Sequence, residues 1–530
     1  MQKNPSTSQL KVFVFSINCL SYNMKAATLF GGLLSAAVAH GSDIFYQGGT
    51  VISFNRNTSN LDILREADLH ISGDRISGIY GANETITPPS NATVVNATGM
   101  IISPGFIDSH HHLWQTAYKT LASNTSLAEY FQRYGEYGPA VQNFHAEDTY
   151  LGQLTGCLEL LHEGTTTVLD HAHGDFSDET TDAAVDATFE CGVRAYYAHA
   201  IHPLPNNYTW DMQTAKLRSL AQDERFNSTG LVQLGLAYDF FSNAPAANVT
   251  ELWNITRGNN LSVITTHFLG GPWGDVNSPV RFHEYDMLNT STPVVFSHAS
   301  FMSKEDANLL RETDQYICTT AESEFHYGHD HPHAHNIQDQ AALGIDTHFT
   351  YSSSMVTQAR LWLQSLRAPQ YLEVLEDWEI PRNNPMSVYQ AFHLITRAGA
   401  LALRRDDIGI IAPGAKADIV TFRGDTPNML GWEDPVAAVI LHSNTGDIDD
   451  VLVNGQYVKR GGKLMYGDYA SLSRRFLESS RRIKSIWNNM DWPRLEGIFN
   501  NISPYADADV IDTQRGDGSG YYAQNGALQR

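Results

Sequence analysis

Eight apolar, β-type runs between residues 100 and 346 constrain the fold of this chain more than any other feature. They cover residues 100–107, 165–170, 193–200, 231–238, 261–266, 293–297, 316–320 and 343–346. Amphipathic stretches, such as 146–162, 178–191 and 304–313, separate several of them. Alternation of this kind is typical of parallel α/β folds, and eight units in about 300 residues predict a (β/α)8 TIM barrel.

Short strand-like runs with Gly and Pro turns flank the predicted barrel on both sides. They cover 44–51, 68–72, 75–80 and 93–96 before it, and 419–423, 437–441, 450–453 and 456–459 after it. We expect residues 40–99 and 408–468 to form one discontinuous β-sandwich around a barrel domain at 100–407. Residues 469–487 have the pattern of a basic amphipathic helix, so 469–530 is predicted to be a C-terminal helix with a flexible tail.

The N-terminal segment has the pattern of a secretory leader. Lys25 precedes an apolar stretch, 26–39, that closes with the small-residue triplet Ala37-Val38-Ala39. We therefore assign residues 1–39 to an upstream segment and a signal peptide, and place the mature start near His40. Translation from Met24 is favoured over an unusually long leader that begins at Met1. A buried apolar helix is the alternative to a leader.

Possible glycosylation sites support secretion. The chain has twelve Asn-x-Ser/Thr sites, where chance gives about five. They are Asn57, Asn83, Asn91, Asn96, Asn124, Asn207, Asn227, Asn248, Asn254, Asn260, Asn289 and Asn501. We expect the protein to be a secreted glycoprotein.

Three cysteines, Cys157, Cys191 and Cys318, remain after the leader is removed. Their spacing is not that of a metal site. We expect buried, small apolar side chains, with a Cys157–Cys191 bridge as the alternative.

The charge balance narrows the choice of partners. With 58 acidic and 35 basic side chains, the net charge is -23, which repels phosphate backbones and anionic lipids. No apolar run reaches the roughly 18 residues that span a bilayer. We expect a small-molecule substrate, no nucleic acid and no membrane span, and the sequence leaves a homo-oligomer open.

Four histidines and an aspartate lie at the carboxyl ends of predicted strands, where barrel enzymes place their chemistry. His110 and His112 follow the first strand, and alternate residues of a strand face the same side. The others are His267 after the fifth strand, His298 after the sixth and Asp346 after the eighth. Imidazoles and a carboxylate at matching strand ends predict a site for a divalent metal ion.

The same residues carry a resemblance to a known family. Pro104-Gly105-Phe106-Ile107-Asp108 before His110-x-His112, and the run 408–420 with its sequel Val453-x-Gly455, are similar to motifs of the amidohydrolase superfamily of metal-dependent hydrolases. The chain resembles its mononuclear branch, which holds cytosine deaminase, S-adenosylhomocysteine deaminase and triazine hydrolases. The resemblance covers roughly residues 43 to 466.

This resemblance implies a role for each strand-end residue. His110, His112, His267 and Asp346 would bind one divalent metal ion, and His298 would lie beside the metal-bound water. The ion lowers the pKa of that water from 15.7 to roughly 7, and Asp346 can pass the water's proton to a leaving nitrogen. Because strand 231–238 has no lysine to bridge two metals, one ion is expected, with zinc favoured over iron.

Further residues are candidates for substrate binding. They are Trp114, Gln115, His171, His173, Tyr238, Glu322, Glu324 and His329. A tryptophan at the position of Trp114 as often only packs against its neighbours, without binding substrate. The two glutamates could instead bind loop backbone or face solvent. In the histidine-rich run 326–335 we expect His329 at the active site and the other histidines on the surface.

One departure from the family pattern affects the choice of reaction. Many deaminases of this branch have a glutamate three residues after the strand-five histidine, and here that position is Gly270. A glycine cannot move a proton. The leading hypothesis is therefore a secreted hydrolase of a carbon–nitrogen bond in an amide, lactam or similar small, cyclic substrate. The second hypothesis is a heterocycle deaminase that releases ammonia, and the third is a non-catalytic metal-binding protein, which the intact ligand set disfavours.

Overall fold

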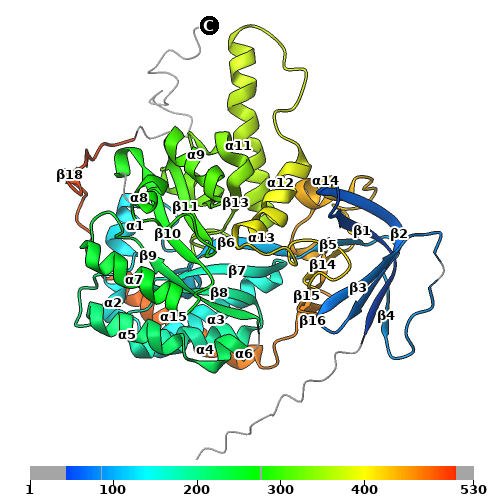
Figure 1. The fold of residues 1–530 in the computed structure, drawn as a ribbon, viewed down its shortest axis with the longest axis horizontal. Coiled ribbons are helices and arrows are strands. Elements are labelled where there is room, and N and C mark those ends of the chain that lie inside the picture. Colours follow the sequence, from blue (N-terminus) through cyan, green and yellow to red (C-terminus); the bar gives the residue numbers. More distant parts are fainter. Residues whose placement is uncertain (1–42, 85, 229, 275–276, 509–530) are drawn as a thin grey trace, which may run out of the picture. The chain divides into compact units, whose positions relative to one another are not determined.

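The eight apolar runs form a parallel barrel in the computed structural model (Figure 1). Its strands pair in chain order: β6 (Phe106–His111), β7 (Thr165–Ala172), β8 (Arg194–Ile201), β9 (Val232–Tyr238), β10 (Ile264–Gly270), β11 (Val294–Phe301), β12 (Tyr316–Thr319) and β13 (Ala341–Leu343). The barrel closes beyond β13, where the Asp346 amide donates to the His110 carbonyl over 2.9 Å and the Asp346 carbonyl accepts from His112 over 3.2 Å. The predicted barrel is therefore confirmed.

The structure describes residues 43–508, apart from 85, 229, 275 and 276. The predicted leader, its cleavage point near His40, the two candidate start sites and the tail from residue 509 lie outside the described residues. No helix of the described part is long and apolar enough to cross a membrane.

Helices and short helical turns connect the barrel strands and surround them (Figure 1). They are η1 (Leu113–Tyr118), α1 (Leu127–Arg133), α2 (Ala140–Asn143), α3 (Ala146–His162), α4 (Asp178–Cys191), α5 (Trp210–Leu220), α6 (Glu224–Ser228), α7 (Ala246–Gly258), η2 (Gly271–Trp273), α8 (Pro279–Glu284), α9 (Lys304–Thr313), α10 (Ala321–Tyr327), η3 (Ala334–Gln340), α11 (Met355–Glu376), α12 (Val388–Leu394) and α13 (Arg397–Ala402). Several begin where a serine satisfies free backbone N–H groups. Ser177 and Ser303, for example, form capping boxes at the starts of α4 and α9.

A nine-stranded sheet combines segments from before and after the barrel. Its strands are β1 (Ile44–Asn55), β2 (Asn60–Ser72), β3 (Arg75–Tyr80), β4 (Thr93–Asn96), β5 (Ile101–Pro104), β14 (Ile419–Phe422), β15 (Ile448–Val453), β16 (Gln456–Arg460) and β17 (Lys463–Leu464). The two halves meet where β5 pairs with β1 on one side and with β14 on the other. The predicted discontinuous β unit is therefore confirmed.

Two strand predictions need correction. The run 100–107 is two strands, since β5 joins the nine-stranded sheet and β6 joins the barrel. The chain changes sheet at Gly105, where a Cβ atom would lie 2.1 Å from the Thr166 hydroxyl oxygen. The run 437–441 is helical, not extended: it lies in α14 (Pro435–Ala437) and the π-helical turn η4 (Ala438–His442). Asp434 starts this helix by accepting hydrogen bonds from two backbone N–H groups.

A buried ion pair joins the barrel to the nine-stranded sheet. Arg194, at the start of β8, donates from Nε and one terminal nitrogen to the two Asp418 carboxylate oxygens over 2.8 and 3.0 Å. Both side chains are almost completely buried. The backbone N–H of Asn454 adds a third hydrogen bond to Asp418, so the charge of the carboxylate is well compensated.

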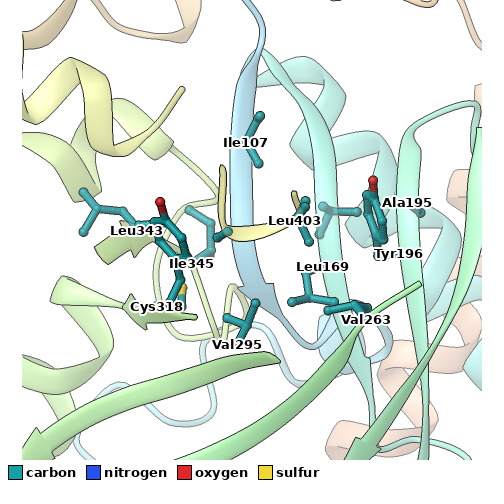
Figure 2. Close-up of a cluster of buried hydrophobic side chains, with 14 of the residues drawn as sticks. Ile107, Leu169, Ala195, Tyr196, Val263, Val295, Cys318, Leu343, Ile345 and Leu403 are labelled. Atoms are coloured by element: carbon teal, nitrogen blue, oxygen red, sulfur yellow. The ribbon is translucent and has the colours of Figure 1, made fainter. Parts of the chain in front are cut away.

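The hydrophobic core runs through the barrel and under its helices. Figure 2 draws a set of these buried side chains, including Ile107, Leu169 and Val295 from β6, β7 and β11. The strands are buried along almost their whole length, as expected for a parallel sheet covered by helices.

A disulfide links the first two long barrel helices. Cys157 of α3 is bonded to Cys191 of α4, whereas Cys318 is free and buried. The prediction of unpaired, small apolar side chains was therefore wrong for Cys157 and Cys191 and right for Cys318.

The predicted C-terminal helix is α15 (Tyr469–Asn488), and a short hairpin, β18 (Ile498–Phe499) and β19 (Ser503–Pro504), follows it. The helix packs on segments that follow the first barrel strand. Ser480 donates to the Ala117 carbonyl of η1, and the Trp487 indole donates to the Arg133 carbonyl at the end of α1. The helix α15 thus supports segments of the first strand–helix connection, which begins at the His110-x-His112 motif.

Candidate metal centre and active site

Three imidazoles at the carboxyl ends of the strands, those of His110 and His112 buried and that of His267 partly exposed, have the same arrangement. In each ring Nδ1 already has a partner: His110 Nδ1 lies 2.8 Å from Ser297 Oγ, His112 Nδ1 donates to the His171 carbonyl over 2.8 Å, and His267 Nδ1 donates to Asp239 Oδ2 over 2.8 Å. The Nε2 atoms are left to face one another, and those of His112 and His267 are 3.3 Å apart. Fixing Nδ1 in this way is typical of histidines that bind a metal through Nε2.

Asp346 completes the set. Its Oδ1 lies 3.6 Å from His110 Nε2 and 3.2 Å from His112 Nε2, and its Oδ2 accepts a hydrogen bond from Ser323. Burial raises the pKa of the Asp346 carboxyl, but the neighbouring imidazoles of His110 and His112 outweigh it and hold the pKa well below its usual range. The carboxyl is therefore an anion at neutral pH.

These residues fit a zinc ion. The donor atoms of His110, His112 and Asp346 lie within 4.8 Å of one another, and those of His110, His267 and His298 do so too. His110 Nε2 is buried without a hydrogen-bond partner, which is costly unless something binds it. Imidazole nitrogens and one carboxylate form a donor set that zinc accepts readily.

Asp239, directly after β9, holds the third imidazole in place. Its carboxylate accepts from the ring and from the backbone N–H of His267, and it lies 3.4 Å from His171 Nε2. The side-chain amide of Asn277 donates both to the Asp239 carbonyl and to the His267 carbonyl. The ends of β7, β9 and β10 are thereby fixed relative to one another.

His298 and Asp346 both have left-handed backbones, with φ of 72° in each case. Residues other than glycine adopt this conformation uncommonly, and active sites are among the places where such residues cluster. His298 Nδ1 lies 3.2 Å from Glu324 Oε1 and 3.1 Å from Thr320 Oγ1, so Nε2 is the free nitrogen of this ring. Burial lowers the pKa of His298 to about 4, which makes the imidazole neutral at pH 7.

The two glutamates near the end of β12 have different surroundings. Glu324 is fully buried. One of its carboxylate oxygens contacts His298 and the other contacts His331. Glu322 accepts instead from the Gln358 side chain over 3.3 Å. Burial raises the pKa of each carboxyl to about 7. His331, expected on the surface, is buried against Glu324, so that expectation was wrong.

Trp114 and Gln115 are also buried, in η1. The Trp114 indole donates to His173 Nδ1 over 3.0 Å, which leaves the ring proton of His173 on Nε2. The Gln115 amide donates to the Tyr130 hydroxyl over 2.9 Å, while its carbonyl oxygen is buried without a partner. In this structure Trp114 orients His173, and the substrate contacts expected of these residues stay predictions.

The remaining candidates lie close to the same centre. The His171 and His267 ring centroids are 4.3 Å apart, and those of His329 and His298 are 4.8 Å apart. His329 Nε2 is buried without a hydrogen-bond partner. Tyr238 ends β9 and lines a neighbouring cavity.

One acidic residue at this site was missed by sequence reasoning. Glu136 lies in the turn after α1 and is 8% exposed. Burial raises the pKa of its carboxyl to about 7, with a further rise from the charge of Asp239 and an opposing effect of His267. The charges of Asp239 and His267 therefore both act on this carboxyl. The available signal was a lone acid in the Tyr134-Gly135-Glu136-Tyr137-Gly138 run.

The structure also explains the glycine after the strand-five histidine. Gly270 has a φ of 71°, and a Cβ atom there would lie 3.0 Å from the Phe301 carbonyl oxygen. A side chain is therefore strained at this position, and any acid must come from another segment. Glu136 is such an acid.

Relatives of known name are similar over most of the chain. A 5-methylthioadenosine/S-adenosylhomocysteine deaminase of Pelotomaculum thermopropionicum is 22% identical over 428 residues, which cover 79% of this chain and 93% of that protein. A 5'-deoxyadenosine deaminase of Methanothermobacter thermautotrophicus is 23% identical over 412 residues, covering 76% of this chain and 91% of that protein.

Solved structures have the same fold. An adenosine deaminase of Xanthomonas campestris with bound zinc matches with a TM-score of 0.72 at 17% identity, over 84% of this chain and 99% of that chain. An atrazine chlorohydrolase of Arthrobacter aurescens complexed with zinc matches with a TM-score of 0.70 at 19% identity, over 82% of this chain and 100% of that chain.

The family assignment rests on a match along most of the sequence. The model of the amidohydrolase family matches residues 101–458, which include the whole barrel and all the candidate metal ligands. The chain therefore belongs to the amidohydrolase family and is a hydrolase.

Proposed function

We propose that this protein uses one zinc ion to hydrolyse a carbon–nitrogen bond of a small heterocyclic substrate. The observation that carries the proposal is the approach of the His110 and His112 Nε2 atoms to Asp346 Oδ1, with His267 Nε2 3.3 Å from His112 Nε2. Zinc in such a site supplies a water that ionises near neutral pH.

The residues around this centre divide the remaining work. Asp346 is an anion held by two imidazoles and Ser323, so it can accept the proton of the attacking water and return it to the leaving nitrogen. Glu324 and Thr320 hold the Nδ1 side of His298, which leaves its Nε2 for a hydrogen bond to the water or to the substrate.

Deamination is the reaction that we favour within this class. A ring amine leaves as ammonia more easily when an acid protonates the ring, and Glu136, with a pKa of about 7, remains partly protonated at neutral pH. The named relatives are deaminases of adenosine compounds, which supports the same choice. Hydrolysis of an amide or lactam is the second candidate, favoured by Gly270 in place of the family glutamate.

The test is a metal assay followed by a substrate screen. We expect about one zinc per chain, and ammonia release from aminated heterocycles, including adenosine and 5'-methylthioadenosine. Amides and lactams form the comparison set. Turnover of the amides alone would replace deamination by the second candidate, and turnover that survives complete metal removal would refute the metal-dependent mechanism.

We also propose that the protein is secreted and glycosylated. Ten of the twelve glycosylation motifs have an exposed asparagine. Asn248 is only partly exposed and lines a cavity, so it does not support the proposal, and the side chain of Asn227 is not described. The Cys157–Cys191 disulfide is typical of an oxidising compartment.

Expression from Met24 in a eukaryotic host should give protein in the medium with an N-terminus near His40 and a mass that falls on deglycosylation. Unmodified intracellular protein would contradict this proposal.

A further inference from the structure

A cavity of about 360 Å³ opens at the carboxyl ends of β8 and β9. The segments that line it, 202–213 and 238–248, come directly after these two strands. Tyr238 lines the cavity, and the next residue, Asp239, binds the imidazole of His267. The cavity therefore lies on the catalytic face of the barrel, beside the metal centre.

The walls of the cavity are mainly apolar. Tyr208, Trp210, Tyr238 and Phe240 supply aromatic rings, and the Tyr238 ring is about equally distant from Trp210 (5.9 Å) and Phe240 (6.0 Å). Tyr137 packs beside it, with ring centroids 5.8 Å from His202 and 6.0 Å from Phe240. The turn that holds Glu136 thus packs against the wall of the cavity.

One polar group in this wall lacks a partner. His202 is buried, and its Nε2 makes no hydrogen bond. Its backbone is fixed, because its N–H donates to the Gln213 side chain and its carbonyl accepts from the same amide. A buried, rigidly held polar atom without a partner in a cavity wall indicates a ligand contact.

Charge is the property that distinguishes this cavity. Among the described residues, none of those that line it is Asp, Glu, Lys or Arg. Burial lowers the pKa of His202 to about 4, so this ring is neutral as well. A ligand carboxylate would lose its hydration here without gaining a cation, and Tyr208 and Trp210 already donate to the carboxylates of Asp178 and Glu251. An apolar group instead gains from burial.

We infer that this cavity binds an uncharged, apolar substituent of the substrate, remote from the reacting carbon, and discriminates against a zwitterionic one. The inference rests on the proposed function, since it assumes that the substrate is held at the metal centre. His202 Nε2 can donate one weak hydrogen bond to a thioether sulfur in that substituent. Among nucleosides, the cavity selects a short alkyl thioether over an amino-acid tail.

Two compounds with the same purine and ribose test this selection in the zinc-loaded protein. 5'-Methylthioadenosine has an apolar 5' group, and S-adenosylhomocysteine has a zwitterionic one. We expect kcat/KM for the first to exceed that for the second by about tenfold or more. Calorimetric titration of both compounds into the same protein measures the preference independently of ammonia release.

Two variants link the preference to the cavity. Asn243→Arg places a cation among the lining residues, so the carboxylate of S-adenosylhomocysteine gains a partner. The ratio of kcat/KM for the two compounds should therefore fall about tenfold. Phe240→Ala should raise KM for 5'-methylthioadenosine about tenfold and change kcat much less, because it removes an apolar wall. Asn489→Arg is the control. It makes the same charge change at an exposed asparagine after α15, which is not a lining residue, and should leave the preference unchanged.

The outcomes separate this inference from the proposed function. One outcome is that 5'-methylthioadenosine binds preferentially, that Asn243→Arg weakens this preference, and that no ammonia is released. This outcome would refute deamination but support the inferred selectivity of the cavity. Equal binding and equal kcat/KM for the two compounds would overturn the inference while leaving deamination in place. Failure of both compounds to bind would overturn it as well.

Discussion

Replacing Glu136 by Gln tests the proposed proton donor directly. A glutamate in water, with a pKa near 4.5, is protonated in only about one molecule in three hundred at pH 7. Because burial raises the pKa of Glu136 to about 7, about half of the molecules carry this proton at that pH. Its environment thus increases the acid form by roughly 150-fold relative to an exposed side chain.

The sign of the pH dependence follows from the direction of this shift. The acid form is complete well below pH 7 and is lost as the pH rises through the pKa, so that about one molecule in ten retains the proton at pH 8. If protonation of the substrate by Glu136 limits the rate, kcat/KM should fall about tenfold per pH unit above pH 7. Glu136→Gln should lower kcat/KM by about 10² to 10⁴-fold and remove this alkaline limb.

The assay measures ammonia release from 5'-methylthioadenosine at about eight pH values between pH 5.5 and 9, which resolves one ionisation. Zinc content is measured on each sample. Glu322→Gln is a matched control, because burial also raises the pKa of Glu322 to about 7 but its side chain contacts Gln358 rather than the metal centre. An alkaline limb that persists in Glu136→Gln with nearly wild-type rates would refute the assignment. Loss of zinc in this variant would show a structural role instead.

Three further predictions concern catalysis and stability. Asp346→Asn should reduce turnover by at least about 10²-fold, because an amide cannot accept the water's proton; near wild-type ammonia release would exclude Asp346 from the proton transfer. Removing one partner of the buried ion pair, as in Asp418→Ala, should lower the free energy of unfolding by about 3–5 kcal/mol, whereas the double variant Arg194→Met, Asp418→Leu should recover most of it. Chemical denaturation measures both, and equal losses would contradict the argument. Replacing both Cys157 and Cys191 by Ser should cost about 4 kcal/mol, since the bridge closes a loop of 34 residues; an unchanged unfolding midpoint would show that the bridge does not stabilise the fold.

The barrel could be predicted because its signal is local and repeated. Each buried strand is a short apolar run, and the metal ligands lie at fixed places relative to those runs. The His110-x-His112 pair, for instance, needs only the two-residue period of a strand to bring both rings to one side. Asp346 needs only the position that follows the last run.

Features that depend on contacts between distant segments could not be predicted. Glu136 belongs to no periodic element, and its turn is placed by contacts of Tyr137 with His202 and Phe240, which follow later strands. The run 437–441 is apolar enough for either a helix or a strand, and the cap at Asp434 decides between them. The Cys157–Cys191 bridge depends on the packing of α3 against α4, which the spacing of the two cysteines does not determine.

The pairing of β5 with β14 has a consequence for how the chain is made. Pro104 ends β5 and Ile419 begins β14, so 315 residues (419 − 104) separate two strands that are neighbours in one sheet. At synthesis rates of about 5 to 20 residues per second, β5 waits roughly 15 to 60 s for that neighbour. During this interval its backbone hydrogen-bonding groups on that side have no strand to pair with, and such edges invite association with other chains. The nascent chain should therefore depend on chaperones until the last strands emerge.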